Sequence, residues 1–310
     1  MIALVIGYGS IGQRHVRILK EQLQLEVDIV TKQSLGNFRT YKSLDQVDNL
    51  ALYDYFVIAS ETSRHFEQLT RLKEAVSGKN ILVEKPLFGK EIEFVCTNNQ
   101  IWIGYNLRLH PLLIKLKELL IGVNIFAVSV RVGEYLPWWR PKTDYRLSYS
   151  ARRDLCGGVV RDISHEIDYI QWLFGNIVRT SSLLGHISDL EIETEDYASI
   201  IGITEHGVSI SLVMDYLSTI PVRDMLIHAS GGITIECNFE TGILSSTTPD
   251  HNRSNWDFSQ VDRDWTYREM HRAILFAGGV NCCMLEEGLS VMRTIEMIFK
   301  NNILELSDGT

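Results

Sequence analysis

The 310-residue sequence has little proline, few cysteines and no long apolar run. Nowhere do about 18 or more apolar residues follow one another, so we expect no membrane-spanning helix. The 6 prolines are too few for a fibrous or linker-like chain. The five cysteines are scattered, without the paired spacing that suits a zinc site, and we expect reduced, mostly buried thiols at Cys96, Cys156, Cys237, Cys282 and Cys283.

The sequence also has fewer basic than acidic residues. The 30 lysines and arginines are outnumbered by 39 aspartates and glutamates, which leaves a formal net charge of -9. Attraction to nucleic-acid phosphates requires basic side chains concentrated on one face, so we expect no nucleic-acid partner. Residues 1–6 lack the basic start and long apolar segment of a secretory signal, and we expect a cytoplasmic protein.

The length favours two domains, because 310 residues exceed the usual size of one. Residues 1–120 alternate short apolar strands with helical patterns such as residues 66–76, which predicts a Rossmann-type, doubly wound parallel sheet. The expected strands are residues 2–6, 25–31, 55–59, 81–83 and 101–104.

Residues 121–310 contain longer alternating segments, which predict an α/β domain with a large mixed, mainly antiparallel sheet. The expected strands are residues 125–132, 198–203, 208–216 and 225–229, and one helix is expected over residues 159–174.

A glycine-rich loop follows the first strand and opens a helix. Residues 7–12 match G-x-G-x-x-G, in which the first glycine permits a tight turn, the second lets the backbone approach a pyrophosphate and the third allows close packing. The context predicts dinucleotide binding, with a plain strand-to-helix turn as the alternative. The expected pyrophosphate contacts are Gly7, Gly9, Ser10, Ile11 and Gly12.

The tip of the second strand bears on the choice between NAD and NADP. The NAD pattern expects an acidic residue about 20 positions after the glycine loop, where this sequence has Thr31 and Lys32. These side chains suit a 2′-phosphate, which favours NADP, with NAD as the alternative. Two other interpretations stay open: Asp28 contacts the ribose if the strand ends earlier, or Lys32 is an ordinary surface lysine.

Three residues have chemistry suited to proton transfer. Lys85 follows the strand at residues 81–83, at the edge where parallel sheets bind ligands, and its side chain can polarise an alcohol as the ammonium or deprotonate it as the neutral amine. The spacing puts Asp162 and His165 on one helix face, where a histidine beside a carboxylate exchanges a proton near neutral pH. Asp162 as a helix cap or arginine partner is the alternative. A metal site of Asp162, His165 and Asp168 would have only one imidazole, so we expect none.

Residues 134–154 combine aromatic and basic side chains at unusual density. Aromatic rings stack on sugars or bases, and arginine guanidinium groups bind carboxylates or phosphates, so an anionic sugar or sugar nucleotide would suit both. The alternative is a surface loop that packs on its own rings or against a neighbouring subunit. The expected substrate contacts are Tyr135, Trp139, Arg140, Tyr145 and Arg146, beside Lys85, Asp162 and His165.

Several spaced motifs occur in a recognisable order. They are G-Y-G-S-I-G-Q-R-H at 7–15, A-S-E-T-S-R-H at 59–65, E-K-P at 84–86, G-Y-N-L-R-L-H-P at 104–111, the glycine-to-His165 segment with W-L-F-G at 172–175, and E-E-G-L at 286–289. In these motifs, and over nearly its whole length, the sequence resembles the glucose-fructose oxidoreductase, inositol dehydrogenase and rhizopine-catabolism (Gfo/Idh/MocA) family. The resemblance implies a nucleotide-binding domain and an α/β domain whose open sheet backs the substrate and often forms the oligomer contact.

The resemblance also implies roles for individual residues. Lys85 and His165 correspond to the family's proton-handling pair, and Asp162 would be the accompanying carboxylate. Many members separate that aspartate and histidine by four positions, whereas here they are three apart, and Cys156 stands where a third glycine is expected. Further cofactor contacts implied by the motifs are Ser60, Thr62, His65, Glu84, Lys85 and Arg108.

The expected activity is hydride transfer between the nicotinamide of NADP or NAD and a secondary alcohol or ketone of a sugar, polyol or sugar derivative. Lys85 and His165 would take the hydroxyl proton, and the chain would form a homodimer or homotetramer through its C-terminal sheet. One alternative is an enzyme with tightly held cofactor and no net redox change, such as an isomerase or glycosidase. Another is a non-catalytic nucleotide-sensing regulator, against which the presence of both Lys85 and His165 argues.

Overall fold

The computed structural model describes residues 1–139 and 143–303, so the expected contact from Arg140 lies outside the described residues. The chain divides into two compact units. Unit 1 comprises Met1–Leu109 and Asp262–Met292, and unit 2 comprises His110–Val261 and Arg293–Thr310. The domain division between residues 120 and 121 stays a prediction, and by contacts the late segment Asp262–Met292 packs with the N-terminal part of the chain.

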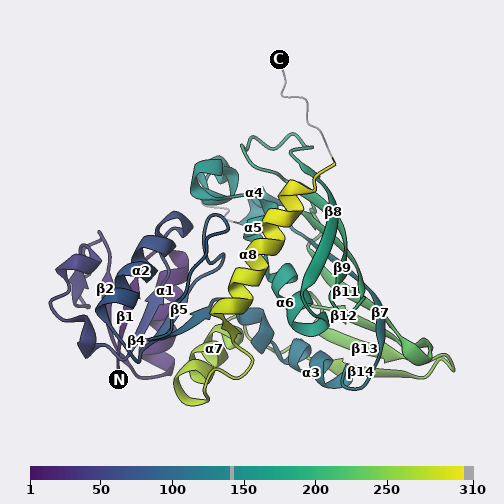
Figure 1. Ribbon diagram of the computed structural model, residues 1–310, viewed down its shortest axis with the longest axis horizontal. Coiled ribbons are helices and arrows are strands. Elements are labelled where there is room, and N and C mark those ends of the chain that lie inside the picture. Colours follow the sequence, from purple (N-terminus) through teal and green to yellow (C-terminus); the bar gives the residue numbers. More distant parts are fainter. Residues whose placement is uncertain (140–142, 304–310) are drawn as a thin grey trace. The chain divides into compact units, whose positions relative to one another are not determined.

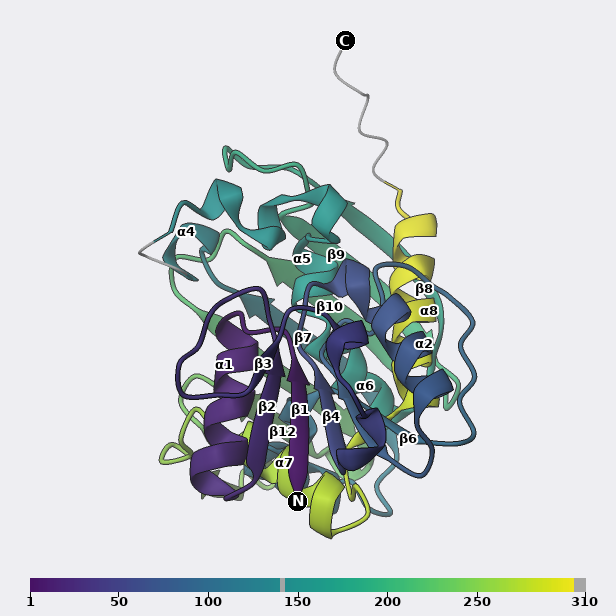
Figure 2. The ribbon, with the colours of Figure 1, turned by 90° about the vertical axis from the view of Figure 1, so that its left-hand side faces the viewer.

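Unit 1 is built on a seven-stranded sheet in the order β15-β6-β5-β4-β1-β2-β3, and Figure 2 shows β2, β1 and β4 side by side. All neighbours are parallel except β15, which runs antiparallel to β6. The predicted Rossmann-type sheet is confirmed. Its strands are β1 (Ile2–Ile6), β2 (Glu26–Val30), β3 (Thr40–Tyr41), β4 (Tyr55–Ile58), β5 (Asn80–Val83), β6 (Gln100–Ile103) and β15 (Cys283–Met284).

Helices pack on this sheet through apolar faces at helical spacing. Helix α1 (Ser10–Arg17) continues into a π-helical turn (Ile18–Gln22), and α2 (His65–Ala75) buries Leu69 and Leu72. The central strands β1 and β4 are buried almost completely, as is typical of a parallel sheet covered on both faces. The other helices are α7 (Trp265–Phe276), α8 (Leu285–Lys300), which runs on into unit 2, and four 3₁₀ turns at Leu44–Gln46, Leu50–Leu52, Thr62–Arg64 and Asn106–Leu109.

Unit 2 is built on an eight-stranded sheet in the order β14-β13-β12-β11-β7-β10-β9-β8. Strands β7 and β10 are parallel and every other neighbouring pair is antiparallel, which confirms the predicted mixed sheet. The strands are β7 (Ile125–Gly133), β8 (Ile177–Gly185), β9 (Tyr197–Thr204), β10 (Ser209–Asp215), β11 (Val222–Ala229), β12 (Thr234–Asn238), β13 (Ile243–Thr247) and β14 (Arg253–Asp257).

The two faces of this sheet differ. Val128, Val130 and Val132 of β7 are buried on the face that α6 contacts (Figure 1), whereas Leu183 and Ile201 on the other face are 36% and 61% exposed. Strand side chains alternate between faces, so one apolar face packs and the other carries exposed apolar side chains. The helices are α3 (Pro111–Leu119), α4 (Leu136–Trp139), α5 (Val159–Asp162) and α6 (His165–Phe174), with 3₁₀ turns at Tyr145–Leu147, Tyr149–Ala151, Arg153–Leu155 and Ser230–Gly232.

The helix expected over residues 159–174 is interrupted. Helix α5 ends at Asp162, Ile163 leaves helical geometry with φ −102° and ψ 28°, and α6 begins at His165. The expectation that Asp162 and His165 share one continuous helix face is therefore wrong. The backbone hydrogen bonds change there: Ile163 still donates to the Val159 carbonyl, but Glu166 donates to the Ile163 carbonyl, three positions earlier, instead of to Asp162.

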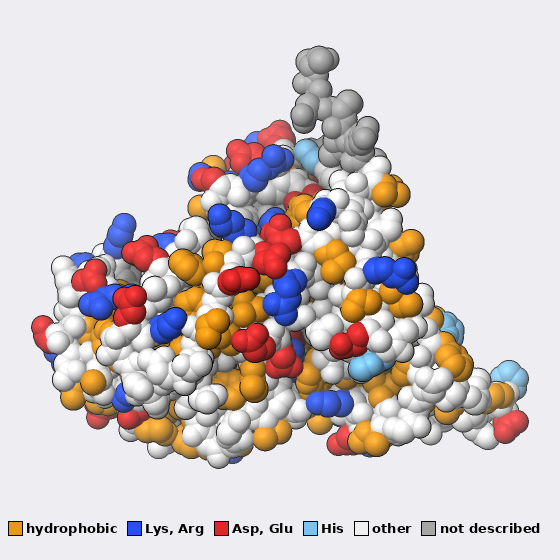
Figure 3. Space-filling model, in the orientation of Figure 1, with side chains coloured by type: hydrophobic (Ala, Val, Ile, Leu, Met, Phe, Trp, Pro, Cys, Tyr) orange, Lys and Arg blue, Asp and Glu red, His pale blue; other side chains and the backbone are white. Residues whose placement is uncertain are grey.

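Two surface properties complete the description. On the face shown in Figure 3, lysine and arginine side chains are interspersed with aspartate and glutamate side chains. Among the helices of the described residues, none combines the length and apolar character needed to cross a membrane.

Candidate active site

The glycine loop between β1 and α1 has the geometry that phosphate binding requires. Gly7 has φ +103°, and a Cβ there would lie 2.5 Å from the carbonyl oxygen of Ala59. A Cβ at Gly12 would lie 2.2 Å from the carbonyl oxygen of Gly7, so both positions need glycine for packing. Gly9 instead faces open space, with nothing within 4 Å of a Cβ built there.

The N-terminus of α1 is suited to an anion. Gly9 precedes the helix, no side chain caps it, and its first turn has no acidic residue. Backbone N–H groups and the helix dipole therefore face the open space beside Gly9, where Ser10 and Ile11 begin the helix. The loop fits a dinucleotide pyrophosphate, because a ligand can approach the backbone at Gly9. At Gly7 and Gly12 the strand and helix pack too closely for any side chain.

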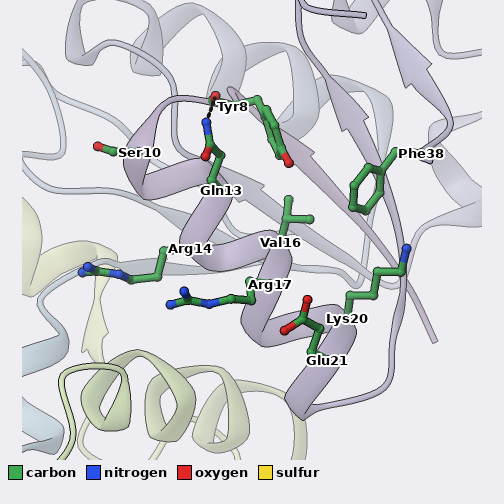
Figure 4. Close-up of a pocket in the computed structure, with 9 residues that line it drawn as sticks. All are labelled: Tyr8, Ser10, Gln13, Arg14, Val16, Arg17, Lys20, Glu21 and Phe38. Carbon is green, nitrogen blue, oxygen red and sulfur yellow. Dashed lines mark hydrogen bonds between the residues drawn. The ribbon is translucent and has the colours of Figure 1, made fainter. Parts of the chain in front are cut away.

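A cavity of about 460 Å³ lies along the flank of α1 (Figure 4). Its basic side chains already have partners, since Arg14 and Arg17 lie 3.4 and 2.5 Å from the carboxylate of Asp264 and Lys20 lies 4.2 Å from the ring centre of Phe38. Of the expected pyrophosphate contacts only Ser10 lines it, and neither Gly9 nor Thr31 does, so we do not assign it to the pyrophosphate.

At the tip of β2, the structure decides between the alternatives for Asp28. Strand β2 continues to Val30, and the Asp28 carboxylate accepts a 2.7 Å hydrogen bond from the Tyr53 hydroxyl, within the sheet. Asp28 is therefore not at the tip. Thr31 is buried with its hydroxyl accepting from the backbone N–H of Gln33, and Lys32 is exposed. The ammonium group of Lys42 donates to the carbonyl of Lys32 at 2.9 Å, which adds a second positive charge beside this tip.

The E-K-P motif follows β5 at the same carboxyl edge of the sheet. Glu84 is buried, and its carboxylate lies 2.9 Å from His15 Nε2 on α1 and accepts from the backbone N–H of Lys85 at 3.3 Å. A Cβ at Gly104 would lie 2.8 Å from Glu84 Oε1, so glycine is needed there to admit the carboxylate. Glu84 thus links the start of the lysine loop to the helix that the glycine loop opens, and Lys85 itself is half-buried.

The other expected cofactor residues of unit 1 contact protein groups. The Ser60 hydroxyl donates to Gln68 at 2.7 Å, and Thr62 begins a 3₁₀ turn. Buried His65 has Nδ1 within 3.2 Å of the Pro86 and Leu87 carbonyls and Nε2 at 3.2 Å from the Ser60 carbonyl.

Burial lowers the pKa of His65, which favours its neutral form. Through its contacts with the carbonyl groups of Ser60, Pro86 and Leu87, this histidine joins the loops after β4 and β5. Arg108, 1% exposed, donates to Glu287 of α8 at 2.7 Å. Neither geometry tests the expected cofactor contacts of His65 and Arg108, and those contacts stay predictions.

In unit 2, hydroxyl groups surround the carboxylate of Asp162. Tyr149 donates to Oδ1, and Ser150 and Tyr216 donate to Oδ2 at 2.5 and 2.8 Å. Burial raises the pKa of Tyr216, and the neighbouring Asp162 carboxylate raises it further, so its hydroxyl stays protonated and remains a donor. These donors come from outside the helix, and they fix Asp162 at the point where α5 ends. Sequence spacing could not show them, because Tyr216 is 54 positions away.

Two further groups lie at the two helices, Glu195 at the start of α5 and His165 at the start of α6. His165 opens α6 and is half-buried. Glu195 accepts from the backbone N–H of Val160 at 3.2 Å, and burial raises its pKa from 4.5 to about 7. A Cβ at Gly158 would lie 2.3 Å from Glu195 Oε1, so this glycine admits the carboxyl group. Sequence analysis did not single out Glu195, which has no motif around it.

The aromatic and basic segment is only partly joined to this cluster. Trp139 packs edge-on against Tyr216, with ring centres 5.2 Å apart, and so lies beside the Asp162 cluster. Tyr135 packs against Trp138 at 5.3 Å. The Tyr145 hydroxyl accepts from the backbone N–H of Glu191.

Arg146 already has carboxylate partners. Its guanidinium contacts Asp144 at 2.8 Å and Glu191 at 2.6 Å. An anionic substrate would have to replace one of these carboxylates. Among the described residues, no three His, Cys, Asp or Glu side chains gather as a metal ion would require.

Family models match both parts of the chain. Residues 2–93 match the model described as the oxidoreductase family, NAD-binding Rossmann fold, and residues 124–235 match the Gfo/Idh/MocA C-terminal domain. The chain belongs to the Gfo/Idh/MocA family of oxidoreductases. The family model thus identifies unit 1, with its glycine loop, as NAD-binding. No curated protein matches the sequence.

Solved structures share the fold across the whole chain. UDP-N-acetylglucosamine 3-dehydrogenase GnnA from Acidithiobacillus ferrooxidans is 18% identical with a TM-score of 0.76, covering 97% of both chains. The WlbA dehydrogenase from Bordetella pertussis, solved with NADH and UDP-GlcNAcA, is 16% identical with a TM-score of 0.76, covering 97% of this chain and 95% of the other. A levoglucosan dehydrogenase in complex with NADH is 16% identical with a TM-score of 0.78, covering 97% and 96%.

Proposed function

We propose that this oxidoreductase reversibly moves a hydride between a nicotinamide nucleotide and a secondary alcohol or ketone of a sugar, polyol or sugar derivative. One observation carries the proposal: Lys85 stands at the carboxyl edge of the sheet that bears the glycine loop, and the 2.9 Å contact between Glu84 and His15 joins the two elements. Ligands of open α/β sheets bind at this edge.

The chain's own residues would handle the proton. When bound, the nicotinamide supplies the hydride acceptor. The neutral amine of Lys85 would take the hydroxyl proton, with His165 as the second proton-handling group, and the resulting ammonium group would hold the carbonyl oxygen of the product. Asp162, fixed by its hydroxyl donors, would orient a substrate hydroxyl rather than carry the proton.

The substrate class is supported by Trp139 and by proteins of the same fold. Trp139 lies beside the Asp162 cluster, and an indole ring stacks well on a sugar ring. GnnA is named for a UDP-sugar, and levoglucosan dehydrogenase for a sugar without a nucleotide. We therefore propose a sugar derivative and include neutral and anionic sugars in the test below.

We propose NADP as the preferred cofactor and NAD as the second candidate. The Asp28 carboxylate is occupied by Tyr53, whereas Thr31, Lys32 and Lys42 surround the tip of β2. Hydroxyl and ammonium groups suit a 2′-phosphate.

We further propose a homodimer or homotetramer formed through the open face of the unit 2 sheet. Leu183 and Ile201 are exposed on that face, and apolar strand faces usually pack against another surface. Sedimentation of the purified protein checks this state, and a monomer at all concentrations would contradict it.

The test of the proposed activity compares Lys85→Met with Lys90→Met. Lys90 is exposed in the same loop region and serves as the matched control. With a nicotinamide nucleotide and a panel of neutral and anionic sugars, we expect Lys85→Met to lower kcat by about 10²- to 10⁴-fold and to change the nucleotide Kd far less. Normal turnover in Lys85→Met would refute the role of Lys85.

A further inference from the structure

Four buried side chains of unit 1 form a continuous hydrogen-bonded chain that ends beside Lys85. Tyr55 Oη lies 2.9 Å from His271 Nδ1, His271 Nε2 lies 2.8 Å from His15 Nδ1, and His15 Nε2 lies 2.9 Å from Glu84 Oε1. Tyr55, His15 and His271 are each 0% exposed. The chain joins β4, α7, α1 and the end of β5, and it uses polar groups for which the proposed reaction has no direct role.

An ionised Glu84 gives every bond in this chain one direction. The carboxylate can only accept, so His15 donates from Nε2, and in a neutral ring its Nδ1 then accepts. His271 must therefore donate from Nε2 and accept at Nδ1. The Tyr55 hydroxyl donates to that Nδ1, and three donors in series point toward the carboxylate.

The surroundings favour the neutral forms of His271 and Tyr55. Burial lowers the pKa of His271 well below its ordinary value. Burial raises the pKa of Tyr55 well above its ordinary value, with smaller contributions from Cys282 and Glu84. Tyr267 packs its ring edge against His15, with ring centres 5.5 Å apart.

The Glu84 end of the hydrogen-bonded chain lies against the E-K-P loop (residues 84–86) that carries Lys85. Glu84 Oε2 accepts the backbone N–H of Lys85, and the backbone of Gly104 closes the other side of the carboxylate. A donor removed from the chain would leave a buried acceptor unsatisfied and let His15 and Glu84 reorient.

We propose that Tyr55, His271 and His15 are positioning residues for Lys85: together they orient the Glu84 carboxylate, which holds the backbone from which the Lys85 side chain extends. This inference rests on the proposed role of Lys85 in catalysis. It adds that the role of Lys85 depends on α7 (Trp265–Phe276), a helix about 180 positions further along the sequence.

The test compares two substitutions at His271. His271→Gln keeps a donor toward His15 and an acceptor toward Tyr55, whereas His271→Leu keeps neither. We expect His271→Leu to lower kcat by about 10- to 100-fold, the size of loss that small misplacement of a reacting group causes, with the nucleotide Kd unchanged. His271→Gln should recover most of that loss.

A second pair of variants covers the case in which His271→Leu does not fold. Tyr55→Phe removes only the first donor, and Tyr53→Phe, which removes a similar bond to Asp28 outside the chain, is its matched control. We expect a severalfold lower kcat for Tyr55→Phe and an unchanged kcat for Tyr53→Phe. Histidine ¹⁵N spectra of the wild-type protein should show His15 and His271 both protonated at Nε2.

The outcomes separate this inference from the proposed activity. If Lys85→Met abolishes turnover while folded His271→Leu and Tyr55→Phe turn over normally, the positioning role is refuted and the proposed activity stands. A His271 ring protonated at Nδ1 would also refute the positioning role. If Lys85→Met retains turnover, the proposed role of Lys85 fails, and the positioning role that rests on it fails too. If the wild-type protein turns over no compound of the panel, the proposed activity itself fails.

Discussion

Replacing Gly9 by alanine should separate cofactor binding from folding. Gly9 has φ −73° and ψ −169°, an extended conformation that any residue adopts, and an added Cβ would meet nothing within 4 Å. Alanine also restricts the unfolded chain, so the free energy of unfolding should stay unchanged or rise by about 0.4–1 kcal/mol.

The effect on binding should be the opposite. The methyl group that Gly9→Ala adds would fill space that the nucleotide pyrophosphate needs for close approach to the backbone. We expect the Kd for NADPH or NADH to rise at least tenfold, a loss of about 1.4 kcal/mol or more. Nucleotide fluorescence titration measures this loss, and urea unfolding of the apoprotein measures stability.

Gly12→Ala is the contrasting variant. Its Cβ would lie 2.2 Å from the Gly7 carbonyl oxygen, so the backbone must shift, at a cost of about 1–3 kcal/mol in the free energy of unfolding.

A stable Gly9→Ala protein that binds nucleotide as tightly as the wild type would refute the assignment of the loop to the pyrophosphate.

Three further predictions concern charge and hydrogen bonding. Burial raises the pKa of Glu195 from 4.5 to about 7, so the folded protein binds the proton of this carboxyl group more tightly than the unfolded chain does. The protonated carboxyl group contributes on the order of 3 kcal/mol to the free energy of unfolding. This contribution is complete below about pH 4.5 and is lost as the pH rises through about 7. Glu195→Gln should flatten the pH dependence of urea midpoints over that range, and an unaltered slope would contradict the assigned cause. Lys32→Glu should weaken NADP⁺ binding relative to NAD⁺, and an unchanged ratio of the two Kd values would remove Lys32 from cofactor choice. Tyr216→Phe should lower the free energy of unfolding by about 1–3 kcal/mol because Asp162 loses a buried donor, and equal stability would show that the bond contributes nothing.

Local patterns predicted the parts of the fold that short segments determine. The apolar run of β1, the glycine loop and α1 follow one another directly, and the structure has them as expected. Alternation likewise indicated β7 and β10, because one sheet face is buried and the other is not. Strands as short as β3 and β15, with two residues each, contain no period that a sequence pattern could show.

Long-range contacts account for what the sequence did not show. Periodicity predicted one helix over residues 159–174, but hydroxyl groups from Tyr149, Ser150 and Tyr216 fix Asp162 where α5 ends. The chain from Tyr55 to Glu84 depends on His271, which lies 256 positions from its partner His15. Glycine and lysine motifs predicted where the candidate site lies, whereas groups that contact its residues, such as His271 and Tyr216, come from distant segments.

Reduction of a nicotinamide nucleotide tests the central claim most directly. Wild-type protein is mixed with NADP⁺ or NAD⁺ and a panel of neutral and anionic sugars, polyols and sugar nucleotides, and the absorbance of reduced nicotinamide is recorded. The proposed function predicts reduction with at least one of these compounds, and its loss in Lys85→Met but not in Lys90→Met. Failure to bind either nucleotide even in excess would contradict it.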